Sequence, residues 1–589
     1  MKYISLINIH LFIKKCSLFL LLALILSCSE SSNSLSNKYK IDTYITTLNA
    51  YYSSDNLISS TSYDQSNLIV KFEDNRMLEM ETKLVTIQEN NWFIKFIFYD
   101  NSTLDVGSVG SFLDFNYDKE EDSIVPLSRN FSVNIPYDGL INWKTHGING
   151  QSSDINSENI IASSGENSFY IHGLYVDYPT DVTINYKNNN NHLRYSETFT
   201  LTSNEFINSI NEIKTLVTTN NEPEYQRFIL LAHRSGSGPL VLDQFGDIRY
   251  YLDKQPPLLD RPLYGLKQTS SGSLLWATVN TIFEYSLDGN MIVNSDIPEK
   301  YGAIHHDLVK FSANQYILTV NNNELSTIED IVILYDVESE SVVNEWDLNI
   351  SIPKSDYFIG SDGFTQSFND WFHVNAVDYV ESDNTLLLSG QRSGVVKLSW
   401  DNELIWFLTD INRFKNESEN IKEKILFNQF NEIITWGQHN IQYDEINDNY
   451  YLFDNGLGRY YAHQDLFSRG VKFKVNQNDL SYNILDTFGE DYPEYHSPII
   501  SGIDFNSKGN TLNLFGSIGY ELTYTNNKDW LGSIWKDPQP EYGAAIQEYN
   551  SNGELILDIK ISSIVNDDSH RFYNKDIGIY RASYFEFNK

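Results

Sequence analysis

The sequence predicts an all-β protein whose main part is a six-bladed β-propeller, and two observations favour this fold. The first is composition. Aromatic residues make up 14% of the 589 residues, with 39 Tyr and 33 Phe, and this bias suits pleated sheets better than helices. The second is a hairpin that recurs six times, in which an apolar strand runs into a turn rich in Asp, Asn or Gly and then into another apolar strand. These hairpins lie at residues 241–248, 285–292, 334–342, 398–405, 473–480 and 549–556.

The hairpins recur at roughly 45 to 75 residues, which indicates one propeller blade per repeat with insertions between blades. We therefore place the propeller at residues 206–589. A chance run of hairpins within a β-sandwich is the alternative interpretation. Residues 205–217 have a helical pattern and are expected to connect the propeller to the unit that precedes it.

Two smaller β units are predicted before the propeller. Residues 45–122 contain short alternating apolar segments bounded by Asn, Asp and Gly, which predict a small β domain. Residues 123–205 contain a second set of such segments, for which an immunoglobulin-like β-sandwich is the expected fold.

The first 27 residues are expected to be a signal peptide. Lys14 and Lys15 precede an apolar run over residues 17–26 that is short for a membrane span. The run ends in Ile-Leu-Ser-Cys, which resembles a bacterial lipobox, so Cys28 is expected to carry a lipid and residues 28–44 to form a flexible tether. An uncleaved anchor is the alternative. The expected location is the bacterial cell envelope, with the lipid on the periplasmic face or at the cell surface of the outer membrane.

Charge and cysteine content exclude several classes of function. A formal net charge of −37 disfavours a nucleic-acid partner, because binding phosphates needs Lys and Arg, and it disfavours docking on an anionic lipid surface. An anionic substrate must therefore be held by a local cluster of cations. The two cysteines, Cys16 and Cys28, both lie in the leader region, so no disulfide, Cys-ligated zinc or cysteine nucleophile is expected in the folded part.

Three histidine sites occur in similar local settings in separate predicted blades. They are His305-His306, His373 and His439, and each opens an apolar alternating strand. If each strand is the innermost of its blade, the three sites converge at the central channel. Asn375 is expected to share one face of its strand with His373. A lone histidine on a strand is more often structural, but three at equivalent places in successive repeats favour a functional site.

Arg392 adds a cation near these histidines. It follows the His373 strand in the segment 389–394, whose other residues are mostly small and would let a ligand approach. Arginine is planar and can bind two oxygens of a sulfate or carboxylate at once, although an isolated arginine is more often a surface ion-pair residue. Three histidines could instead bind a metal. An arginine beside a metal is unfavourable, so we expect no metal and no other cofactor.

In their order and spacing, these segments resemble the family of PAPS-independent aryl-sulfate sulfotransferases. The matching stretches lie at residues 173–178, 242–250, 305–307, 370–375, 389–392, 438–439, 453–459, 467–471 and 580–582. The resemblance covers about residues 125–589. It implies a six-bladed propeller that moves a sulfuryl group from a small phenolic sulfate donor to a phenolic acceptor.

By motif position, the resemblance implies that His439 is the nucleophile and carries the sulfuryl group as a sulfohistidine. The groups that it places around the sulfuryl oxygens are His373, Asn375, Arg392 and one of His305 and His306. A polar residue that the family places late in the channel falls near residues 500–501, and Ser501 is expected to be this substrate-binding residue. Strand phase favours His305, because it is expected to align with His373. The segment 411–433 departs from the family pattern, since it has no Cys where family members often carry a short disulfide loop.

Two other functions stay open from the sequence. One is a different propeller enzyme, such as a polysaccharide lyase or a sulfate-ester hydrolase, in which a sugar or water replaces the phenol. The other is a non-catalytic surface lipoprotein that binds glycans or proteins. The oligomeric state is open as well, with a homodimer as one form.

Overall fold

The computed structural model describes the chain from residue 58 to residue 588, with gaps. The described residues are 58–64, 67–72, 77–88, 91–97, 103–106, 115–117, 124–135, 138–187, 189, 191, 193–203, 213–233, 238–253, 263–325, 327–356, 370–414, 418–430, 432–457, 459, 465–518, 520–524, 531–535, 542–563 and 578–588. The predicted signal peptide, Cys28 and the tether lie outside them. None of the helices within these ranges is long and apolar enough to cross a membrane.

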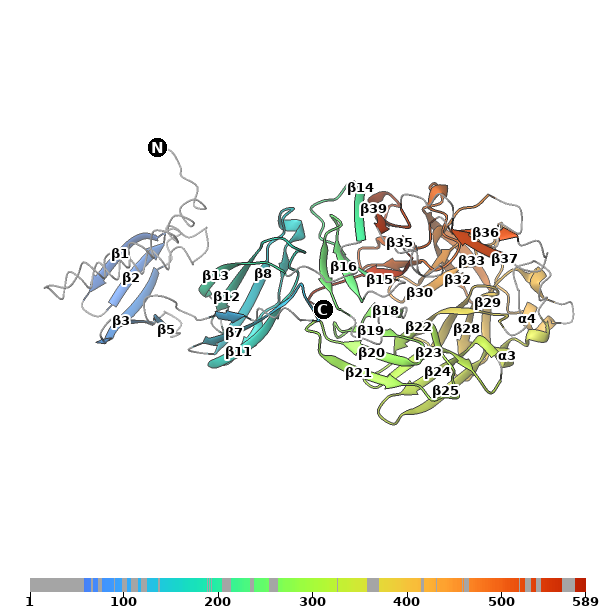
Figure 1. The fold of residues 1–589 in the computed structure, drawn as a ribbon, viewed down its shortest axis with the longest axis horizontal. Helices are drawn as coiled ribbons and strands as arrows, with labels where there is room; N and C mark the ends of the chain where they lie inside the picture. The colour runs from blue at the N-terminus through green and yellow to red at the C-terminus, as the bar shows by residue number, and fades with distance from the viewer. Residues whose placement is uncertain are drawn as a thin grey trace.

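The first described unit is a five-stranded antiparallel meander in chain order (Figure 1). Its strands are β1 (Ile58–Asp64), β2 (Asn67–Phe72), β3 (Met77–Gln88), β4 (Asn91–Ile97) and β5 (Thr103–Val106). It lies inside the span 45–122, for which the sequence predicts a small β domain.

The second unit is a β-sandwich of two sheets, ordered β10-β8-β12-β13 with β9 beside β8, and β11-β7-β6. Its strands are β6 (Phe115–Tyr117), β7 (Arg129–Ile135), β8 (Gly139–Thr145), β9 (Ile155–Asn156), β10 (Ile160–Ala162), β11 (Gly165–Ile171), β12 (Thr180–Lys187) and β13 (Leu193–Leu201). Buried residues alternate along β7 and β8, so each strand turns one face to a core that contains Phe131 and Trp143. The sandwich begins before the predicted boundary at 123, because β6 pairs with β7.

The rest of the chain forms six antiparallel sheets of at least four strands, which are the predicted blades. Blades 1 to 3 consist of β15 (Phe228–His233), β16 (Leu240–Asp243), β17 (Ile248–Tyr251) and β40 (Ile579–Tyr584); of β18 (Tyr264–Gln268), β19 (Leu274–Ala277), β20 (Thr281–Tyr285) and β21 (Met291–Asp296); and of β22 (Ile304–Lys310), β23 (Gln315–Asn322), β24 (Thr327–Asp336) and β25 (Ser341–Asp347).

Blades 4 to 6 consist of β26 (Val374–Val380), β27 (Thr385–Gly390), β28 (Gly394–Ser399) and β29 (Leu404–Leu408); of β30 (His439–Asp444), β31 (Asn449–Asp454), β32 (Arg469–Asn476) and β33 (Ser481–Phe488); and of β34 (Gly502–Phe505), β35 (Thr511–Phe515), β38 (Ala544–Tyr549) and β39 (Leu555–Ser563). A separate hairpin, β36 (Tyr520–Tyr524) and β37 (Leu531–Trp535), lies between β35 and β38 in the sequence. Each of the six hairpins predicted from the sequence joins the two outer strands of one blade, so the six-bladed fold is confirmed.

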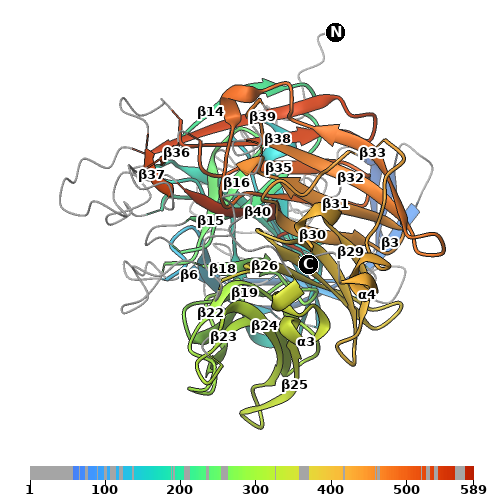
Figure 2. The ribbon, with the colours of Figure 1, turned by 90° about the vertical axis from the view of Figure 1, so that its right-hand side faces the viewer.

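The blades form a closed ring. Their inner strands, in the order β40, β18, β22, β26, β30 and β34, each contact the next, and β34 returns to β40. Figure 2 shows the labels of β40, β18, β26 and β30 around the middle of this ring. The ring closes through pairing of β40, near the C-terminus, with β15 in the first blade. The first blade is therefore built from strands at both ends of the propeller.

A second closure corrects the prediction of a helical connector at residues 205–217. Residues 213–217 belong to a strand, β14 (Ile213–Asn220), which pairs with β39 as a fifth strand of blade 6. Its alternating residues are Ile213, Thr215 and Val217 on one face, a period of two that suits the open edge of a sheet better than a helix. Residues 204–212 lie outside the described ranges.

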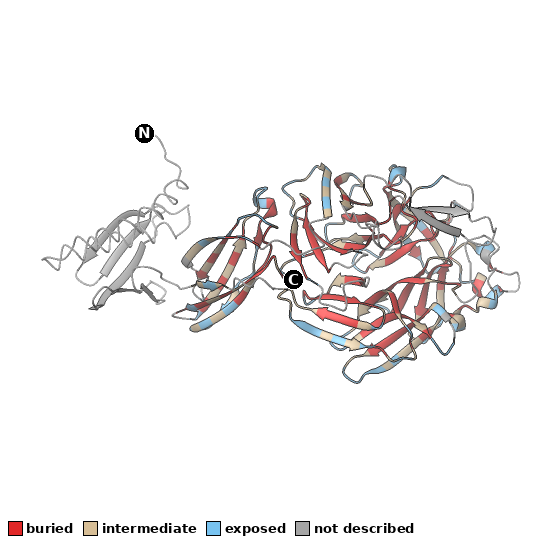
Figure 3. Ribbon diagram, viewed as in Figure 1, coloured by how far each residue is buried: buried red, intermediate tan, exposed pale blue. Residues whose placement is uncertain are grey.

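The sandwich and the propeller share one hydrophobic cluster, which runs from Phe131 and Trp143 to Leu230 and Tyr250 in blade 1. Figure 3 shows that the strands of both units carry buried residues. Arg249 of β17 reinforces this junction. It donates hydrogen bonds to the backbone carbonyls of Gly173 and Ser153 in the sandwich, at 2.9 and 2.6 Å. These contacts place the sandwich beside the first blade.

The segment between blades 4 and 5, which lacks the family's cysteines, is held by backbone hydrogen bonds. It contains the short helix α4 (Glu419–Lys422). Leu426 donates to the carbonyl of Phe407 in blade 4, and Phe427 donates to the carbonyl of Leu480 in blade 5, at 2.8 and 2.9 Å. These bonds tie the segment to both neighbouring blades.

Candidate functional site

Four successive blades place a residue of left-handed backbone conformation at the start of the inner strand. These residues are His306, His373, Asn440 and Ser501, with φ of 58°, 61°, 77° and 81°. The register of the first three strands shifts at the same point. L residues rarely adopt this conformation, which costs on the order of 1–3 kcal/mol each, and bulges re-aim the neighbouring side chains. The repetition indicates a functional centre where the inner strands meet.

Glu329 of β24 joins the histidines of blades 3 and 4. Its Oε2 lies 2.6 Å from Nδ1 of His373 and 3.4 Å from Nε2 of His306. The two imidazole rings are 5.1 Å apart. The neighbouring imidazoles outweigh the effect of burial and hold the pKa of Glu329 well below its usual value. Glu329 is therefore a partly buried carboxylate between two imidazoles.

Asp370 extends this network to Arg392. Its Oδ1 lies 3.0 Å from Nδ1 of His373, and its Oδ2 lies 2.7 Å from NH2 of Arg392. Burial by itself lowers the pKa of His373, but the carboxylates of Glu329 and Asp370 outweigh it and raise this pKa to about 9. His373 is therefore a cation at neutral pH.

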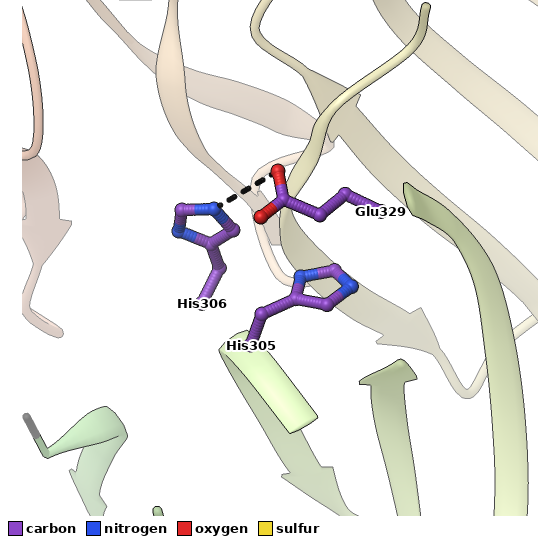
Figure 4. Close-up of side chains that lie close together, drawn as sticks. All are labelled: His305, His306 and Glu329. Carbon is purple, nitrogen blue, oxygen red and sulfur yellow. Dashed lines mark ion pairs between the residues drawn. The ribbon is translucent and has the colours of Figure 1, made fainter. Parts of the chain in front are cut away.

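His305 lies beside the same carboxylate but is differently placed (Figure 4). Figure 4 shows both imidazole rings next to Glu329, with the ion pair formed by His306. Neither ring nitrogen of His305 has a hydrogen-bond partner of good geometry among the described residues, and burial lowers its pKa to about 3. The strand-phase argument that favours His305 assumes regular alternation, and the register shift between Ile304 and Leu308 removes that regularity. The residue that shares the left-handed conformation of His373 is His306.

His439, at the start of β30, has a different environment. Its Nδ1 lies 3.0 Å from the backbone carbonyl oxygen of Ser501, which can only accept a hydrogen bond, so Nδ1 carries the proton. Its Nε2 is buried and has no hydrogen-bond partner among the described residues. Burial, followed by the positive charge of Arg581, lowers the pKa of His439 well below its usual value. His439 is a neutral imidazole whose lone pair on Nε2 is available.

Tyr580 of β40 lies between the two groups of histidines. Its hydroxyl is 2.5 Å from Nδ1 of His306, and its ring centroid is 5.5 Å from that of His439. Burial raises the pKa of Tyr580 well above its usual value, so the phenol keeps its proton and can donate it to His306. The rings of His306 and His439 are 5.9 Å apart. The histidines of blades 3, 4 and 5 therefore meet in one site.

Asn375 and Ser501 contact the backbone around His439. The amide nitrogen of Asn375 donates to the carbonyl of Gln438, at 2.7 Å. The hydroxyl of Ser501 lies 2.8 Å from that of Ser497 and accepts from the backbone N–H of Gly516, at 2.9 Å. Both side chains are fully buried. In this structure they hold the chain on either side of the candidate nucleophile.

Two sets of side chains could hold a metal ion by distance. They are His305, His306 and Glu329, and Glu329, Asp370 and His373, with ligand atoms within 4.8 Å of one another in each set. Glu329 belongs to both. The ion pairs of Glu329 with His306 and His373, and of Asp370 with Arg392, already account for this closeness.

Four residues of the site were not predicted as functional from the sequence. They are Glu329, Asp370, Tyr580 and Arg581. Asp370 and Tyr580-Arg581 stand inside stretches that carry the family resemblance, which is a signal that could have identified them. Glu329 is followed by another acidic residue and then by an apolar run, a pattern that occurs at the start of many strands. Nothing local in the sequence therefore marks Glu329 as a site residue.

Comparison with known families identifies one match. The family model described as "Arylsulfotransferase (ASST)" matches residues 213–571, which include all six blades except the closing strand β40. The candidate residues from His305 to Ser501 lie inside this range.

Two relatives carry the name "Arylsulfate sulfotransferase AssT". The one from Escherichia coli is 22% identical over 343 residues, which cover 47% of this chain and 57% of that protein. The one from Lelliottia amnigena is 21% identical over 359 residues, which cover 50% of this chain and 59% of that protein. The match thus spans somewhat more than half the length of these relatives.

Solved structures are similar only at low scores. A protein of unknown function from Bacteroides caccae has a TM-score of 0.35 at 8% identity, over 61% of this chain and 98% of that one. The WD40 domain of Pan2 from Neurospora crassa has a TM-score of 0.27 at 10% identity, over 59% of this chain and 88% of that one. Scores this far below 0.5 carry no argument about function.

Proposed function

The chain belongs to the arylsulfotransferase (ASST) family, and from this premise we propose that it transfers a sulfuryl group from a phenolic sulfate ester to an acceptor phenol through a sulfohistidine at His439. One observation carries the proposal. The Nδ1–H of His439 is held by the carbonyl of Ser501, and Nε2 is buried with no partner among the described residues. A neutral imidazole with a free lone pair is the form that acts as a nucleophile.

In the first half-reaction, Nε2 of His439 attacks sulfur along the line of the leaving oxygen. The Nε2–S bond forms as the S–O(aryl) bond breaks, and the electron pair leaves with the phenolate. His439 keeps its proton on Nδ1, so the sulfonated ring carries a positive charge. The carbonyl of Ser501, 3.0 Å from Nδ1, stabilises that charge.

The leaving phenolate is stabilised by the protonated His373 on the other side of the site. His373 carries a proton at neutral pH, because its pKa is raised to about 9 by Glu329 and Asp370 against the effect of burial. It can stabilise the sulfuryl oxygens or give its proton to the phenolate. When His373 has given its proton to the phenolate, it is the base of the second half-reaction: it takes the proton of the acceptor phenol, the phenol oxygen attacks sulfur, and the S–Nε2 bond breaks, with its electron pair returning to Nε2 of His439. The enzyme returns to its starting state.

Incubation with a chromogenic aryl sulfate, with and without an added phenol, tests the proposal. We expect phenol-dependent release of the chromophore, and a sulfonated peptide containing His439 on mass spectrometry when phenol is omitted. His439→Ala is expected to abolish both signals. His146→Ala is a matched control, because His146 lies in the sandwich and hydrogen-bonds Thr183 there.

The alternatives give different results in the same experiment. Release that does not depend on phenol would indicate a sulfate-ester hydrolase. No release with any aryl sulfate would favour a different substrate class or a glycan-binding or protein-binding lipoprotein. A His439→Ala protein with full activity would exclude the sulfohistidine.

We also propose that the protein is anchored to the bacterial envelope by a lipid on Cys28. The lipobox-like ending of the leader and the polar residues that follow it support this proposal. Metabolic labelling with a fatty acid is expected to label the full chain and not its Cys28→Ala variant. Equal labelling of both proteins would refute the anchor.

A further inference from the structure

Arg581 carries a buried positive charge that the steps described above do not use. It lies on β40, directly after Tyr580, and is 7% exposed. Among the described residues its guanidinium has one ion-pair partner, Asp307, and neither Nε nor NH2 makes a hydrogen bond. Buried donors without partners are costly, and they are usually satisfied by a ligand if no protein group is present.

The side chain of Arg581 approaches the candidate nucleophile. Its Cδ lies 3.5 Å from the position that a Cβ on Gly502 would occupy, and the amide nitrogen of Asn440, next to His439, lies 3.1 Å from the same position. On its other side, NH2 is 3.6 Å from Asp307 in blade 3. Arg581 therefore reaches from blade 1 towards blade 3 and passes Gly502 of blade 6, beside which the side chain of Asn440, the neighbour of His439, also lies.

Asp307 pairs only loosely with Arg581. The Oδ1 of Asp307 is 3.1 Å from Nζ of Lys267, and its Oδ2 accepts a hydrogen bond from the N–H of Val377, at 3.3 Å. The Arg581 distance of 3.6 Å is longer than a hydrogen bond. Asp307 is thus shared with Lys267 and Val377, and its pairing with Arg581 leaves Nε and NH2 of the guanidinium free to donate to a ligand.

Arg392, the arginine that the sequence singles out, is placed differently. Its NH1 donates to the backbone carbonyl of Asp370 at 2.8 Å, and its NH2 pairs with the carboxylate of the same residue at 2.7 Å. Two of its donors are therefore occupied by one residue, and its charge is balanced locally.

We propose that Arg581 is a further catalytic residue, which donates hydrogen bonds to the sulfuryl oxygens while the group is bound to the donor and to His439. This inference rests on the proposed sulfuryl transfer. A guanidinium matches two oxygens of a sulfate at once, and a charge held in a dry site stabilises developing negative charge strongly. The guanidinium of Arg581 also supplies a local cation, which an anionic donor needs because the net charge of −37 otherwise repels it.

The role of Arg581 is tested with Arg581→Met and Arg581→Lys. Arg581→Met is expected to lower kcat/KM for an aryl sulfate by about 100- to 1,000-fold, the usual effect of removing one such donor, and to slow formation of sulfonated His439 in a single turnover equally. Arg581→Lys is expected to recover about tenfold of this loss, because lysine restores the charge but not the two-oxygen geometry. Arg469→Lys is the control, since Arg469 has a similar exposure, 7% against 8% for the side chain, and pairs with Glu490 outside the centre.

Two further measurements separate catalysis from a structural role. The acid limb of the pH–rate profile is expected to move to higher pH in Arg581→Met, because a positive charge beside His439 is removed. Inorganic sulfate is expected to inhibit the wild type competitively and the Met variant at least tenfold more weakly. A folded Arg581→Met protein within threefold of the wild-type rate would overturn the inference. If that variant does not fold, a folded Arg581→Lys protein with wild-type rate and sulfate inhibition would do so.

The outcome for the wild type distinguishes this inference from the proposed function. If the wild type forms no sulfonated His439, the proposed function fails and this inference fails with it. If the wild type and Arg469→Lys both form it and Arg581→Met forms it equally fast, the role of Arg581 alone is refuted.

Discussion

The candidate site has two sides, a paired side and an open side, which differ in whether their ionisable groups have partners. On the paired side, each ionisable side chain has at least one partner within 3.4 Å; this side consists of His306, Glu329, Asp370, His373 and Arg392. On the open side, Nε2 of His439 and two nitrogens of Arg581 are buried without a hydrogen-bond partner among the described residues. Paired groups hold a fixed protonation state and geometry, whereas unpaired buried groups are the ones that a substrate can satisfy. Under the proposed function, this difference leads us to expect proton transfer on the first side and bond formation on the second.

On the paired side, the largest loss of activity is expected when Glu329 is replaced by Gln. It removes a carboxylate that raises the pKa of His373, so His373 loses its proton nearer to neutral pH. We expect kcat/KM at pH 8 to fall about 100-fold and the alkaline limb of the profile to move to lower pH. The control is Glu345→Gln, because Glu345 pairs with Lys300 elsewhere in blade 3.

An unchanged alkaline limb in a folded Glu329→Gln protein would show that His373 does not take part through its proton. Steady-state rates over pH 6 to 10, with circular dichroism to confirm the fold, are sufficient for this comparison.

The pH dependence of the wild type tests both sides together. His439 stays neutral through the neutral range, because burial and Arg581 lower its pKa, and His373 stays cationic up to its pKa of about 9. We therefore expect a flat rate near pH 7 to 8 and about a tenfold loss per pH unit above 9. A rate that rises steadily through pH 9 would contradict the assigned protonation states.

The free energy of unfolding should depend on pH through these histidines, and His373 should act in the opposite direction to His305 and His439. The folded protein binds a proton at His373 that the unfolded chain loses near pH 6.5, so this contribution is complete below about 6.5 and is lost as the pH rises to about 9. The lowered pKa values of His305 and His439 act in reverse, because below about pH 6.5 the unfolded chain takes up protons that the folded protein does not. The contribution of these histidines to the free energy of unfolding is expected to peak near pH 6.5, as measured by urea unfolding at several pH values.

The smallest effect is expected from His305→Phe. The ring nitrogens of His305 lack good hydrogen bonds and its pKa of about 3 keeps the ring neutral, so an apolar ring of similar shape should fit. We expect kcat/KM within about threefold of the wild type and a free energy of unfolding unchanged or higher by up to about 1 kcal/mol. His306→Phe, which removes the contacts with Glu329 and Tyr580, is the matched variant and should lose at least tenfold. Equal losses in both variants would remove the distinction between the two histidines.

Much of the fold could be predicted because its signals are local. A turn such as the one at Gly289, with φ of 83°, indicates a hairpin from only a few residues of sequence. All six predicted hairpins lie in blades. His439 was within reach as one of three similar histidines at the start of a strand, but only the family resemblance around residues 438–439 and 453–459 singled it out as the candidate nucleophile. The helical connector at 205–217 failed because pairing with β39, more than 300 residues later in the chain, overrides the local pattern.

The sequence alone predicted the all-β class, the number of blades and the blades that contain the histidines, because short-range alternation and turn residues determine these features. The sequence could not predict that the site divides into a paired and an open side. That division depends on a carboxylate from β24, a carbonyl from the start of blade 6 and an arginine from the closing strand, which only ring closure brings into one site with the histidines. It depends also on bulges that turn His306 and His373 into left-handed conformations. Protonation and availability of a lone pair follow from these long-range neighbours, and so the tertiary structure decides the chemistry.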